Sequence, residues 1–401
     1  GVFAPMTRPI ALRNGRVVTP DAVIDRGRVV ITADRITDVG DDRGPISGVR
    51  SIDVEGRLVL PGLIDLHGDD IEGHRYPRSG APVDAQTALL SADRTNLYNG
   101  VTTKFHAVAF EESPEADRSY DDARAIAREI DTASYTLADN RFHARCELDP
   151  RSIEAVERVA STRSVDLLSV MHHAPGEGQF DRAQFETHYR ENREWSTEAI
   201  GQISSTRSLR SQSERDELLG RVASLSRTLD VPVASHDDEG SAAVDRAANA
   251  GVTISEYPLT LEAARRAADC GLVTAMGAPN LVRGESLWDN LSAREAIDEG
   301  LVDILCADYH PPSLLAAALT DTGEPLSVRV NRVTKNPAEA VGLDDRGRLE
   351  PGTRADVIVV DPASPPTVSY AFVAGSPVFA AGTTPVSTRA TDPLRLLGPG
   401  S

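Results

Sequence analysis

Eight short apolar segments recur along the chain between residues 63 and 308, and helical stretches separate most of them. Strands that alternate with helices predict a parallel sheet, because each helix carries the chain back to the start of the next strand. Eight such units predict an α/β fold of the (β/α)8 TIM-barrel type. The predicted strands are 63–67, 101–108, 141–147, 165–173, 231–236, 252–257, 272–277 and 302–308. The clearest helical stretches are 115–131, 213–229, 241–250 and 261–269.

Both ends of the chain have a different pattern, of short strands separated by turns. Asn14-Gly15 is a dipeptide typical of hairpin turns, and valine and isoleucine are frequent on either side of it. We therefore predict a small β-sandwich domain built from residues 7–60 and 349–388, with the barrel formed by 61–348. The segment 175–212 is a long insertion, which we expect either to cover the barrel mouth or to pack as a plain loop.

The chain carries 61 Asp and Glu residues against 42 Lys and Arg residues, a formal net charge of −19 at pH 7. Such a charge opposes binding to nucleic acid. Only two of the basic residues, Lys104 and Lys335, are lysines. An acidic, lysine-poor surface is typical of proteins from salt-loving organisms, since carboxylates keep the surface hydrated. We therefore expect a halophilic source.

Membrane and secretion signals are missing from the sequence pattern. No run of about 18 uncharged apolar residues occurs, and the first residues lack the layout of a signal peptide. Cys146, Cys270 and Cys306 form no closely spaced pair. These patterns predict a protein of the reducing cytoplasm. Lys104 lies on a predicted strand, where a buried ammonium group would need an acidic partner.

Side chains of the kinds that bind metals stand at the ends of several predicted strands. His67 and Asp69 follow the first strand two residues apart, so they point the same way on an extended backbone. A histidine bonded to a backbone carbonyl would explain this pair if it stood alone. The same residue types end the third, fourth, fifth and eighth strands, at Glu147, His173, His236 and Asp308.

The carboxyl ends of barrel strands open at one mouth, where barrel enzymes keep their chemistry. Imidazoles and carboxylates gathered there predict two divalent metal ions, zinc first, with manganese or iron as alternatives. Two such ions can clamp a group under attack, and Asp308 can both bind metal and accept a proton during catalysis. His106 and His143 lie earlier on their strands, where a histidine more often belongs to the core.

Several motifs, taken in order, resemble the amidohydrolase superfamily over nearly the whole chain. Three segments of this chain are similar to the general signatures of that superfamily: "LPGLIDLH", "VTKNPAEAVGL" and "GRLEPGTRADVIVVD". Six more blocks resemble one branch, the α-D-ribose 1-methylphosphonate 5-triphosphate diphosphatases of the carbon–phosphorus lyase pathway. These blocks are "HARCEL", "VMHHAPGEGQF", "ASHDDEG", "SEYPLTLEAA", "MGAPNLVRG" and "DILCADYHPPSLL".

The resemblance implies a barrel flanked by a split β-domain and the metal set named above. It also implies hydrolysis of the ribose triphosphate to the 5-phosphate and pyrophosphate. The chain departs from the branch at three positions around the site. Asp70 stands where asparagine is usual, His172 where aspartate is common and His310 where tyrosine is typical. These departures bear on the choice of substrate rather than on the metal ligands.

A polyphosphate substrate requires cations at the mouth of the barrel. Arg283 and Asn280 follow the seventh strand, in a region where barrels often hold phosphate. The guanidinium of Arg283 suits a bidentate phosphate clamp. Arg75 and Arg78 follow the first metal motif and are further candidates, and His310 lies in a mouth loop where it could contact substrate.

Three functions stay open on the sequence. The first is a metal-dependent diphosphatase that acts on a phosphorylated sugar. The second keeps the fold and the metals but hydrolyses the C–N bond of a cyclic or N-acyl amide, and it would need no cluster of arginines. The third is a non-catalytic barrel, which would usually have lost its metal ligands. We expect a small-molecule substrate, no nucleic acid or membrane partner, and leave a homo-oligomeric state open.

Overall fold

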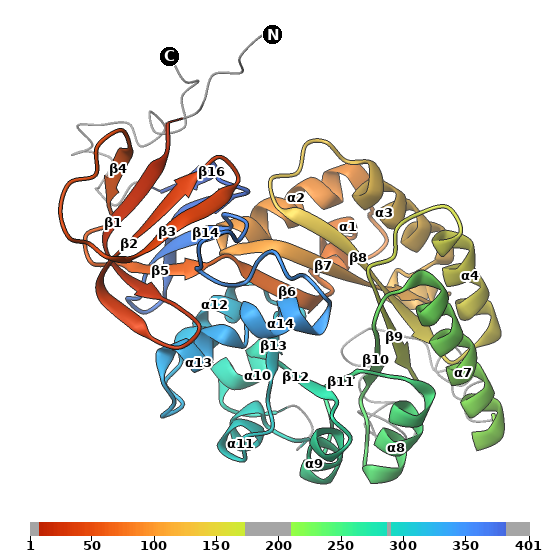
Figure 1. The fold of residues 1–401 in the computed structure, drawn as a ribbon. Coiled ribbons are helices and arrows are strands. Elements are labelled where there is room, and N and C mark those ends of the chain that lie inside the picture. Colours follow the sequence, from red (N-terminus) through yellow and green to blue (C-terminus); the bar gives the residue numbers. More distant parts are fainter. Residues whose placement is uncertain (1–7, 173–209, 287–289, 382–401) are drawn as a thin grey trace.

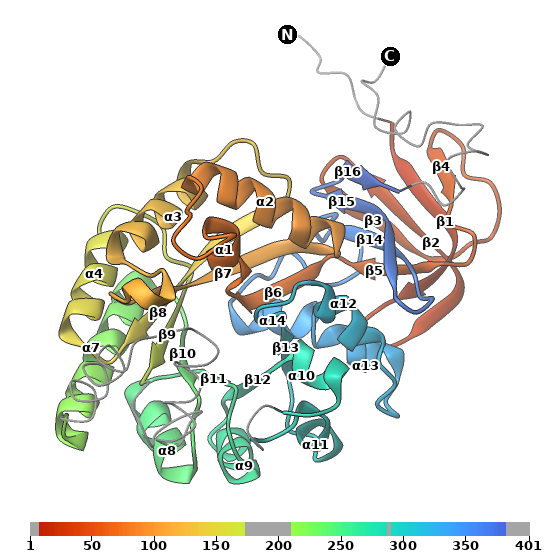
Figure 2. The same ribbon diagram turned by 180° about the vertical axis from the view of Figure 1, so that it is seen from behind.

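The structure is a computed structural model that describes residues 8–172, 210–286 and 290–381. It contains a barrel of parallel strands and a second sheet that lies beside the barrel (Figures 1 and 2). The predicted insertion 175–212 lies outside the described residues except for its last three positions. The predicted ligand His173 and the predicted end of the β-domain beyond residue 381 also lie outside them.

The barrel confirms the fold predicted from the alternating pattern. Its eight strands pair in parallel with their neighbours in chain order, from β6 to β13. Each predicted strand is found, with small shifts at the ends. The strands are β6 Leu63–Gly68, β7 Val101–Phe110, β8 Asp139–Glu147, β9 Leu167–Met171, β10 Val233–His236, β11 Ile254–Glu256, β12 Val273–Gly277 and β13 Ile304–Cys306.

The barrel closes where β13 meets β6. At the carboxyl end, the backbone N–H of Asp308 donates to the His67 carbonyl at 2.9 Å, and that of Asp69 donates to the Asp308 carbonyl at 3.0 Å. Further down, residues 332 and 333 come between the two strands: the N–H of Leu305 donates to the Arg332 carbonyl at 3.0 Å. This insertion explains why β13 is shorter than the predicted strand 302–308. It leaves Asp308 two residues beyond the strand, next to His67.

Helices cover the outside of the barrel (Figure 1). Their apolar faces pack on the strands, as Ala123, Ile126 and Ala127 of α3 do. No helix among the described residues is long and apolar enough to cross a membrane. The helices are α1 Asp70–Arg75, α2 Ala85–Tyr98, α3 Tyr120–Thr132, α4 Pro150–Ala160, α7 Gln212–Leu229, α8 Ser241–Ala250, α9 Leu261–Asp269, α10 Ala278–Arg283, α11 Ala293–Asp298, α12 Pro312–Leu319, α13 Leu326–Asn331 and α14 Lys335–Ala340, with a 3-10 turn at Pro114–Ala116.

Side-chain caps fix the start of several of these helices. Ser119, Asp149 and Thr260 each accept a hydrogen bond from the backbone of the first turn of α3, α4 and α9. Ser211 forms a reciprocal capping box with Glu214 at the start of α7. Such caps satisfy N–H groups that have no partner inside the helix. The cap at Ser119 explains why α3 begins later than the predicted stretch 115–131.

The second sheet unites the two ends of the chain, as the strand pattern predicted. Its N-terminal strands are β1 Ile10–Val18, β2 Val23–Thr32, β3 Arg35–Asp41, β4 Arg50–Asp53 and β5 Leu58–Pro61, and its C-terminal strands are β14 Val357–Asp361, β15 Thr367–Val373 and β16 Ser376–Ala380. Strand β5 joins the two sets, because it pairs in parallel with β1 and antiparallel with β14. One apolar cluster spans the sheet, with Leu12, Val29, Val59, Val357 and Phe372 among its members.

The interpretation of Asn14-Gly15 as a hairpin turn is wrong. Both residues lie inside β1, where the pairing with β2 shifts register on either side of Gly15. Asn14 has a φ of 55°, which asparagine tolerates better than most residues. A Cβ at Gly15 would lie 2.7 Å from Val59 Cγ2. The dipeptide therefore forms a β-bulge that lets β1 pack closely on β5.

Lys104 is fully buried on β7 and lies between two carboxylates. Its Nζ is 2.6 Å from Asp65 Oδ2 and 2.8 Å from Asp70 Oδ1. Lys104 thus has two acidic partners where one was predicted. The second partner, Asp70, is one of the residues at which the chain departs from the resembled branch. A Cβ at Gly68 would lie 1.9 Å from Lys104 Nζ, so only glycine leaves room for the ammonium group.

Replacing Lys104 by methionine should destabilise the barrel strongly. The substitution leaves two buried carboxylates without their cation, which typically costs about 3–5 kcal/mol. Lys335→Met is a matched control, because the other lysine pairs with Glu339 at 3.5 Å on the surface and should contribute less than about 1 kcal/mol. Urea unfolding at neutral pH measures both. Equal stability of Lys104→Met and the wild type would contradict the assigned ion cluster.

His106, also buried on β7, should make stability depend on pH. Its Nε2 donates to Asn140 Oδ1 at 2.7 Å. Burial, followed by the nearby Lys104 charge, lowers its pKa from 6.5 to about 4. A depressed histidine pKa contributes stability that is complete above the unfolded pKa of about 6.5 and is lost as the pH falls towards 4.

Between pH 7 and pH 5, the free energy of unfolding should therefore fall by roughly 2 kcal/mol more in the wild type than in His106→Gln. Glutamine is the matched variant, because it can still donate to Asn140 but does not titrate. Urea unfolding of both proteins across this range measures the difference. Parallel pH profiles would show that His106 does not stay neutral in the fold.

Candidate metal centre and active site

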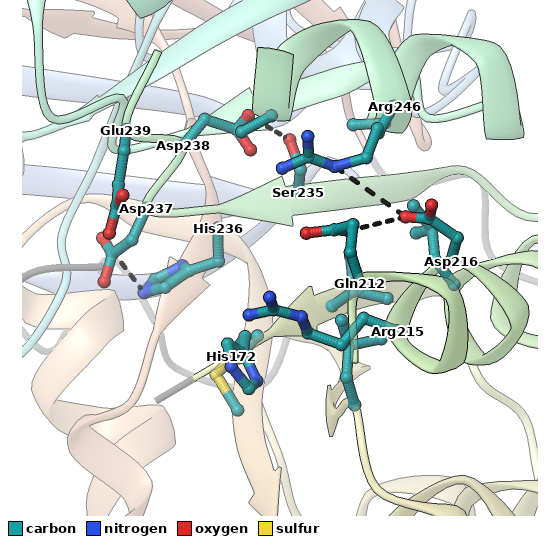
Figure 3. Close-up of a pocket in the computed structure, with 16 residues that line it drawn as sticks. His172, Gln212, Arg215, Asp216, Ser235, His236, Asp237, Asp238, Glu239 and Arg246 are labelled. Atoms are coloured by element: carbon teal, nitrogen blue, oxygen red, sulfur yellow. Dashed lines mark hydrogen bonds and ion pairs between the residues drawn. The ribbon is translucent and has the colours of Figure 1, made fainter. Parts of the chain in front are cut away.

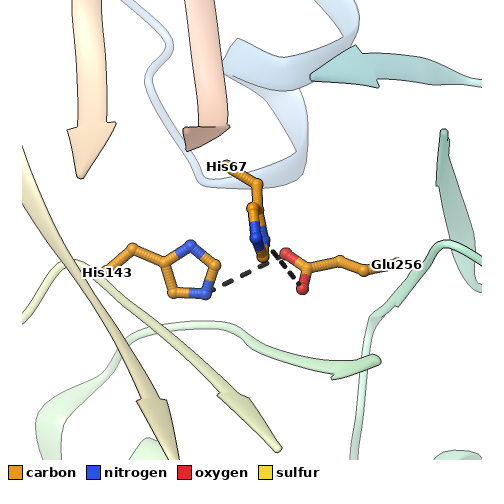
Figure 4. Close-up of side chains that lie close together, drawn as sticks. All are labelled: His67, His143 and Glu256. Carbon is orange, nitrogen blue, oxygen red and sulfur yellow. Dashed lines mark ion pairs between the residues drawn. The ribbon is translucent and has the colours of Figure 1, made fainter. Parts of the chain in front are cut away.

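Three buried side chains from three different strands meet in the barrel mouth: His67 of β6, His143 of β8 and Glu256 of β11 (Figure 4). Glu256 Oε2 lies 3.1 Å from His67 Nδ1, and Glu256 Oε1 lies 3.9 Å from His143 Nε2. One ligand atom from each of the three residues lies within 4.8 Å of the others. Two imidazoles and a carboxylate at this separation have the composition of a divalent-metal site.

His236 of β10 and Tyr257 extend this cluster. The His236 ring stacks on the His67 ring with centroids 5.4 Å apart, and its Nδ1 lies 3.3 Å from Glu256 Oε2. The Tyr257 ring stands edge-on to both imidazoles, with centroids 5.2 Å away in each case. The predicted ligands His67 and His236 are therefore brought together.

The three imidazoles are held in the neutral form that binds metals. Burial is the main reason that the pKa of His67 lies well below 6.5 and that those of His143 and His236 fall to about 3. His143 Nδ1 donates to the Leu66 carbonyl at 2.9 Å, which leaves the lone pair on Nε2. A neutral ring keeps such a lone pair available to a metal at physiological pH.

Two of these ring nitrogens also have unmet bonding capacity. His67 Nδ1 and His143 Nε2 are buried and have no hydrogen-bond partner among the described residues. Buried polar atoms without a partner are costly unless a ligand or ion satisfies them. Because the Glu256 carboxylate faces both nitrogens, a cation between them would satisfy all three groups. The residues therefore fit a metal ion.

Asp69 and Asp308 lie beside each other at the point where the barrel closes. In the protein chain alone, burial raises the pKa of Asp308 to about 8, and the Asp69 carboxylate is the next cause of the rise. Burial also raises the pKa of Asp69, against the opposing charge of Arg145. Two carboxylates held this close in a poorly hydrated site repel each other, and cations relieve that repulsion.

The backbone is strained at three positions around the mouth. Asp237, Tyr257 and Asp308 have φ values of 59°, 54° and 57°, and each comes one or two residues after a barrel strand. Side chains other than glycine rarely adopt this left-handed conformation, which costs of order 1–3 kcal/mol per residue. Such strain tends to gather at functional sites, in agreement with the assignment of the mouth as the site.

The remaining two predicted metal ligands are Glu147 and His173. Glu147 is buried at the end of β8, and its backbone N–H donates to Ser152 Oγ at 3.0 Å. It lies on the same face of β8 as His143, four residues further along. His173 lies outside the described residues, directly after His172. The membership of both residues in a metal site stays a prediction.

The predicted substrate-binding residues lie at the rim or support it. Arg283 is exposed at the end of α10 and donates to Tyr309 Oη at 3.2 Å. Asn280 accepts from the N–H of Ala293 at 2.8 Å, so it holds the loop before α11. His310 is exposed and its Nδ1 is 2.7 Å from Ser313 Oγ.

Two arginines follow the His67–Asp69 motif, and they differ in their surroundings. Arg75 pairs with Asp122 at 2.6 Å, so its charge is already neutralised within the chain. Arg78 is exposed in the loop between α1 and α2. Of this pair, only Arg78 remains a candidate for substrate binding.

A cavity of about 310 Å³ adjoins His236, between β9 and β10 on one side and α7 and α8 on the other (Figure 3). His172, the second departure from the resembled branch, lines it. Arg215 and Arg246 lie on its wall, and Arg246 pairs with Asp216 at 3.8 Å (Figure 3). The volume falls within the range of small-molecule sites.

Sequence reasoning missed two members of the cluster. His143 was expected to be a core histidine, and although it is buried, its Nε2 faces Glu256. A period of two along β8 relates His143 to Glu147 and could have indicated a shared face. Glu256 carried a signal as well, because it ends the sixth barrel strand.

Comparison with known proteins agrees with this picture. The model of the amidohydrolase family matches residues 58–386. The chain is 34% identical over 329 residues to the α-D-ribose 1-methylphosphonate 5-triphosphate diphosphatase of Escherichia coli K12, with 77% of this chain and 84% of that protein covered. It is 25% identical over 404 residues to an imidazolonepropionase of Streptomyces coelicolor, with 90% and 92% covered.

Solved structures share the fold at low sequence identity. A Xaa-Pro dipeptidase with bound methionine superposes with a TM-score of 0.63 and 17% identity, over 93% of this chain and 100% of that one. The ochratoxinase of A. niger superposes with a TM-score of 0.62 and 16% identity, over 96% and 99%. The barrel, its metal-type cluster and the family match together show that the chain belongs to the amidohydrolase family and is a metal-dependent hydrolase.

Proposed function

We propose that this hydrolase cleaves α-D-ribose 1-methylphosphonate 5-triphosphate to the 5-phosphate and pyrophosphate, as a step of phosphonate catabolism. The observation that carries the proposal is the identity with the E. coli diphosphatase, which extends over most of both chains. The substrate is a small phosphorylated sugar, and the cavity next to His236 has the volume for a ligand of this kind.

The proposed metal ligands are His67, Asp69, Glu147, His173, His236 and Asp308, and the structure adds His143 and Glu256 to the candidates. We propose two divalent ions, with zinc first because imidazole and carboxylate ligands suit it. When bound, such ions lower the pKa of a water molecule and withdraw charge from the phosphoryl group under attack. The neutral imidazoles and the paired carboxylates described above support this assignment.

Asp308 is the proposed catalytic residue. It lies two residues beyond β13 and beside Asp69, where its carboxylate can accept the proton of the attacking water. The water oxygen forms a bond to the phosphorus nearest ribose, and the bond from that phosphorus to the bridging oxygen breaks, so that pyrophosphate leaves. Arg283, Arg78, Asn280 and His310 remain proposed contacts for the substrate at the rim.

The likeness to proteins named imidazolonepropionase favours a second candidate, hydrolysis of a cyclic or N-acyl amide at the same metal site. This candidate keeps Asp308 and the metal ligands in their roles. A panel of cyclic and N-acyl amides, assayed in parallel with the ribose triphosphate, separates the two. Turnover of an amide with no release of pyrophosphate would select the second candidate.

Glu256→Gln should weaken metal binding. The carboxylate either contacts the metal or orients His67 and His236, and loss of such a group typically costs about ten- to a hundred-fold in affinity. Metal analysis after dialysis against a graded chelator measures the change, with about two equivalents expected in the wild type. Glu262→Gln is the control, since Glu262 accepts from Ser241 N on the outside of the barrel. Unchanged retention of metal in Glu256→Gln would exclude Glu256 from the site.

The proposed reaction predicts where an oxygen label goes. In ¹⁸O-water, the label should enter the sugar 5-phosphate, because attack occurs at the phosphorus nearest ribose, and ³¹P NMR should show pyrophosphate as the first product. Asp308→Asn should keep the fold but lose roughly 10²- to 10⁴-fold in kcat, the usual contribution of a general base. Label in pyrophosphate, or orthophosphate as the first product, would refute the proposed direction of attack.

A further inference from the structure

A second buried cation, Arg145, lies among the candidate metal ligands. It stands on β8 two residues after His143 and two before Glu147, so the three side chains share the inward face of the strand. Arg145 is only 6% exposed. Its Nη1 lies 3.6 Å from Asp69 Oδ2, a predicted metal ligand. The guanidinium therefore reaches from β8 to the carboxylate that follows β6.

Two of the three guanidinium nitrogens of Arg145 form no hydrogen bond with the described part of the chain. Its Nε and Nη1 are buried and have no hydrogen-bond partner among the described residues. The distance of 3.6 Å to Asp69 is too long for a hydrogen bond. Two other buried arginines differ, because Arg332 donates to Glu324 at 2.6 Å and Arg346 donates to Asp139 at 2.6 Å.

A buried guanidinium with unmet donors is costly unless an anion compensates it. Asp69 cannot supply that compensation fully once it contributes its charge to a metal. Metal ions would draw on the carboxylates of the candidate site, so these groups would compensate the Arg145 charge less; the carboxylates are Asp69, Glu147, Glu256 and Asp308. The Nε–H and Nη1–H groups of Arg145 are therefore available for a ligand.

We propose that Arg145 binds an anionic phosphoryl group of the substrate next to the metal ions. The inference rests on the proposed function and adds a binding residue that the sequence did not single out. The planar fork of a guanidinium matches two oxygens of a phosphoryl group. An anionic phosphoryl oxygen would compensate the buried charge of Arg145, whereas a neutral carbonyl would not.

Phosphate binding to metal-loaded protein tests the proposal without turnover. Isothermal titration with inorganic phosphate should show roughly ten- to a hundred-fold weaker binding in Arg145→Gln than in the wild type, as expected for one charge-assisted bidentate contact. Metal content should stay unchanged. Arg145→Lys keeps the charge but loses the fork, so its affinity should fall between the two. It also provides a second variant if glutamine prevents folding.

Arg141→Gln is the matched control. Arg141 lies on the same face of β8, but near its start, and pairs with Asp139 and Asp166. Its replacement should leave phosphate affinity unchanged. Titration with acetate distinguishes a phosphate site from a general anion site, since Arg145→Gln should affect phosphate more than acetate.

Three results would overturn the proposal. Equal phosphate affinity in the wild type and Arg145→Gln would do so, as would a larger loss for acetate than for phosphate. A loss that disappears when both proteins are compared at equal metal occupancy would make Arg145 a positioning residue for Asp69. If phosphate binding depends on Arg145 but the ribose triphosphate is not hydrolysed, the proposed substrate fails and the Arg145 site stands.

Discussion

The ion cluster of Lys104 with Asp65 and Asp70 is the interaction on which the rest of the structure depends. While Asp65 Oδ2 binds the ammonium group at 2.6 Å, its Oδ1 accepts the backbone N–H groups of His67 at 3.2 Å and Ala307 at 2.9 Å. One carboxylate thus neutralises a buried lysine and joins β6 to the chain that follows β13. Those contacts fix the backbone next to His67 and Asp308, so barrel closure and the geometry of the site have the same origin.

The same poorly hydrated interior determines the chemistry of the mouth. Burial keeps His67, His143 and His236 neutral and raises the pKa of Asp308. It also makes two N–H groups of Arg145 costly, since the described residues offer them no hydrogen-bond acceptor. Crowded carboxylates and a guanidinium with unpaired donors are unfavourable in such an interior. The proposed cations and anionic substrate would relieve this cost when they bind, so stability lost in the free chain would be converted into affinity.

Much of the fold could be predicted from the sequence because it depends on local patterns. The eight strands and the helices between them follow from apolar runs, β-branched residues and caps such as Ser119 and Ser211. The failures have local causes too. Asn14-Gly15 has the conformational freedom for a turn, but Val54 and Val59, which approach from β5 and the loop before it, made it a bulge. Arg332 and Val333 shortened β13 by taking hydrogen bonds that a neighbouring strand would have received.

The sequence by itself determined the barrel, the acidic character of the chain and the ligand types at its strand ends, because strand polarity places every carboxyl end at one mouth. Only the tertiary structure decided which of these side chains meet. Glu256 joins His67 and His143 across three strands, Arg75 is withdrawn to Asp122, and Arg145 is left beside Asp69. Such choices depend on distances between atoms from remote parts of the chain. Hydrophobic periodicity along one strand carries no information about those distances, since it reports which face is buried but not what lies opposite.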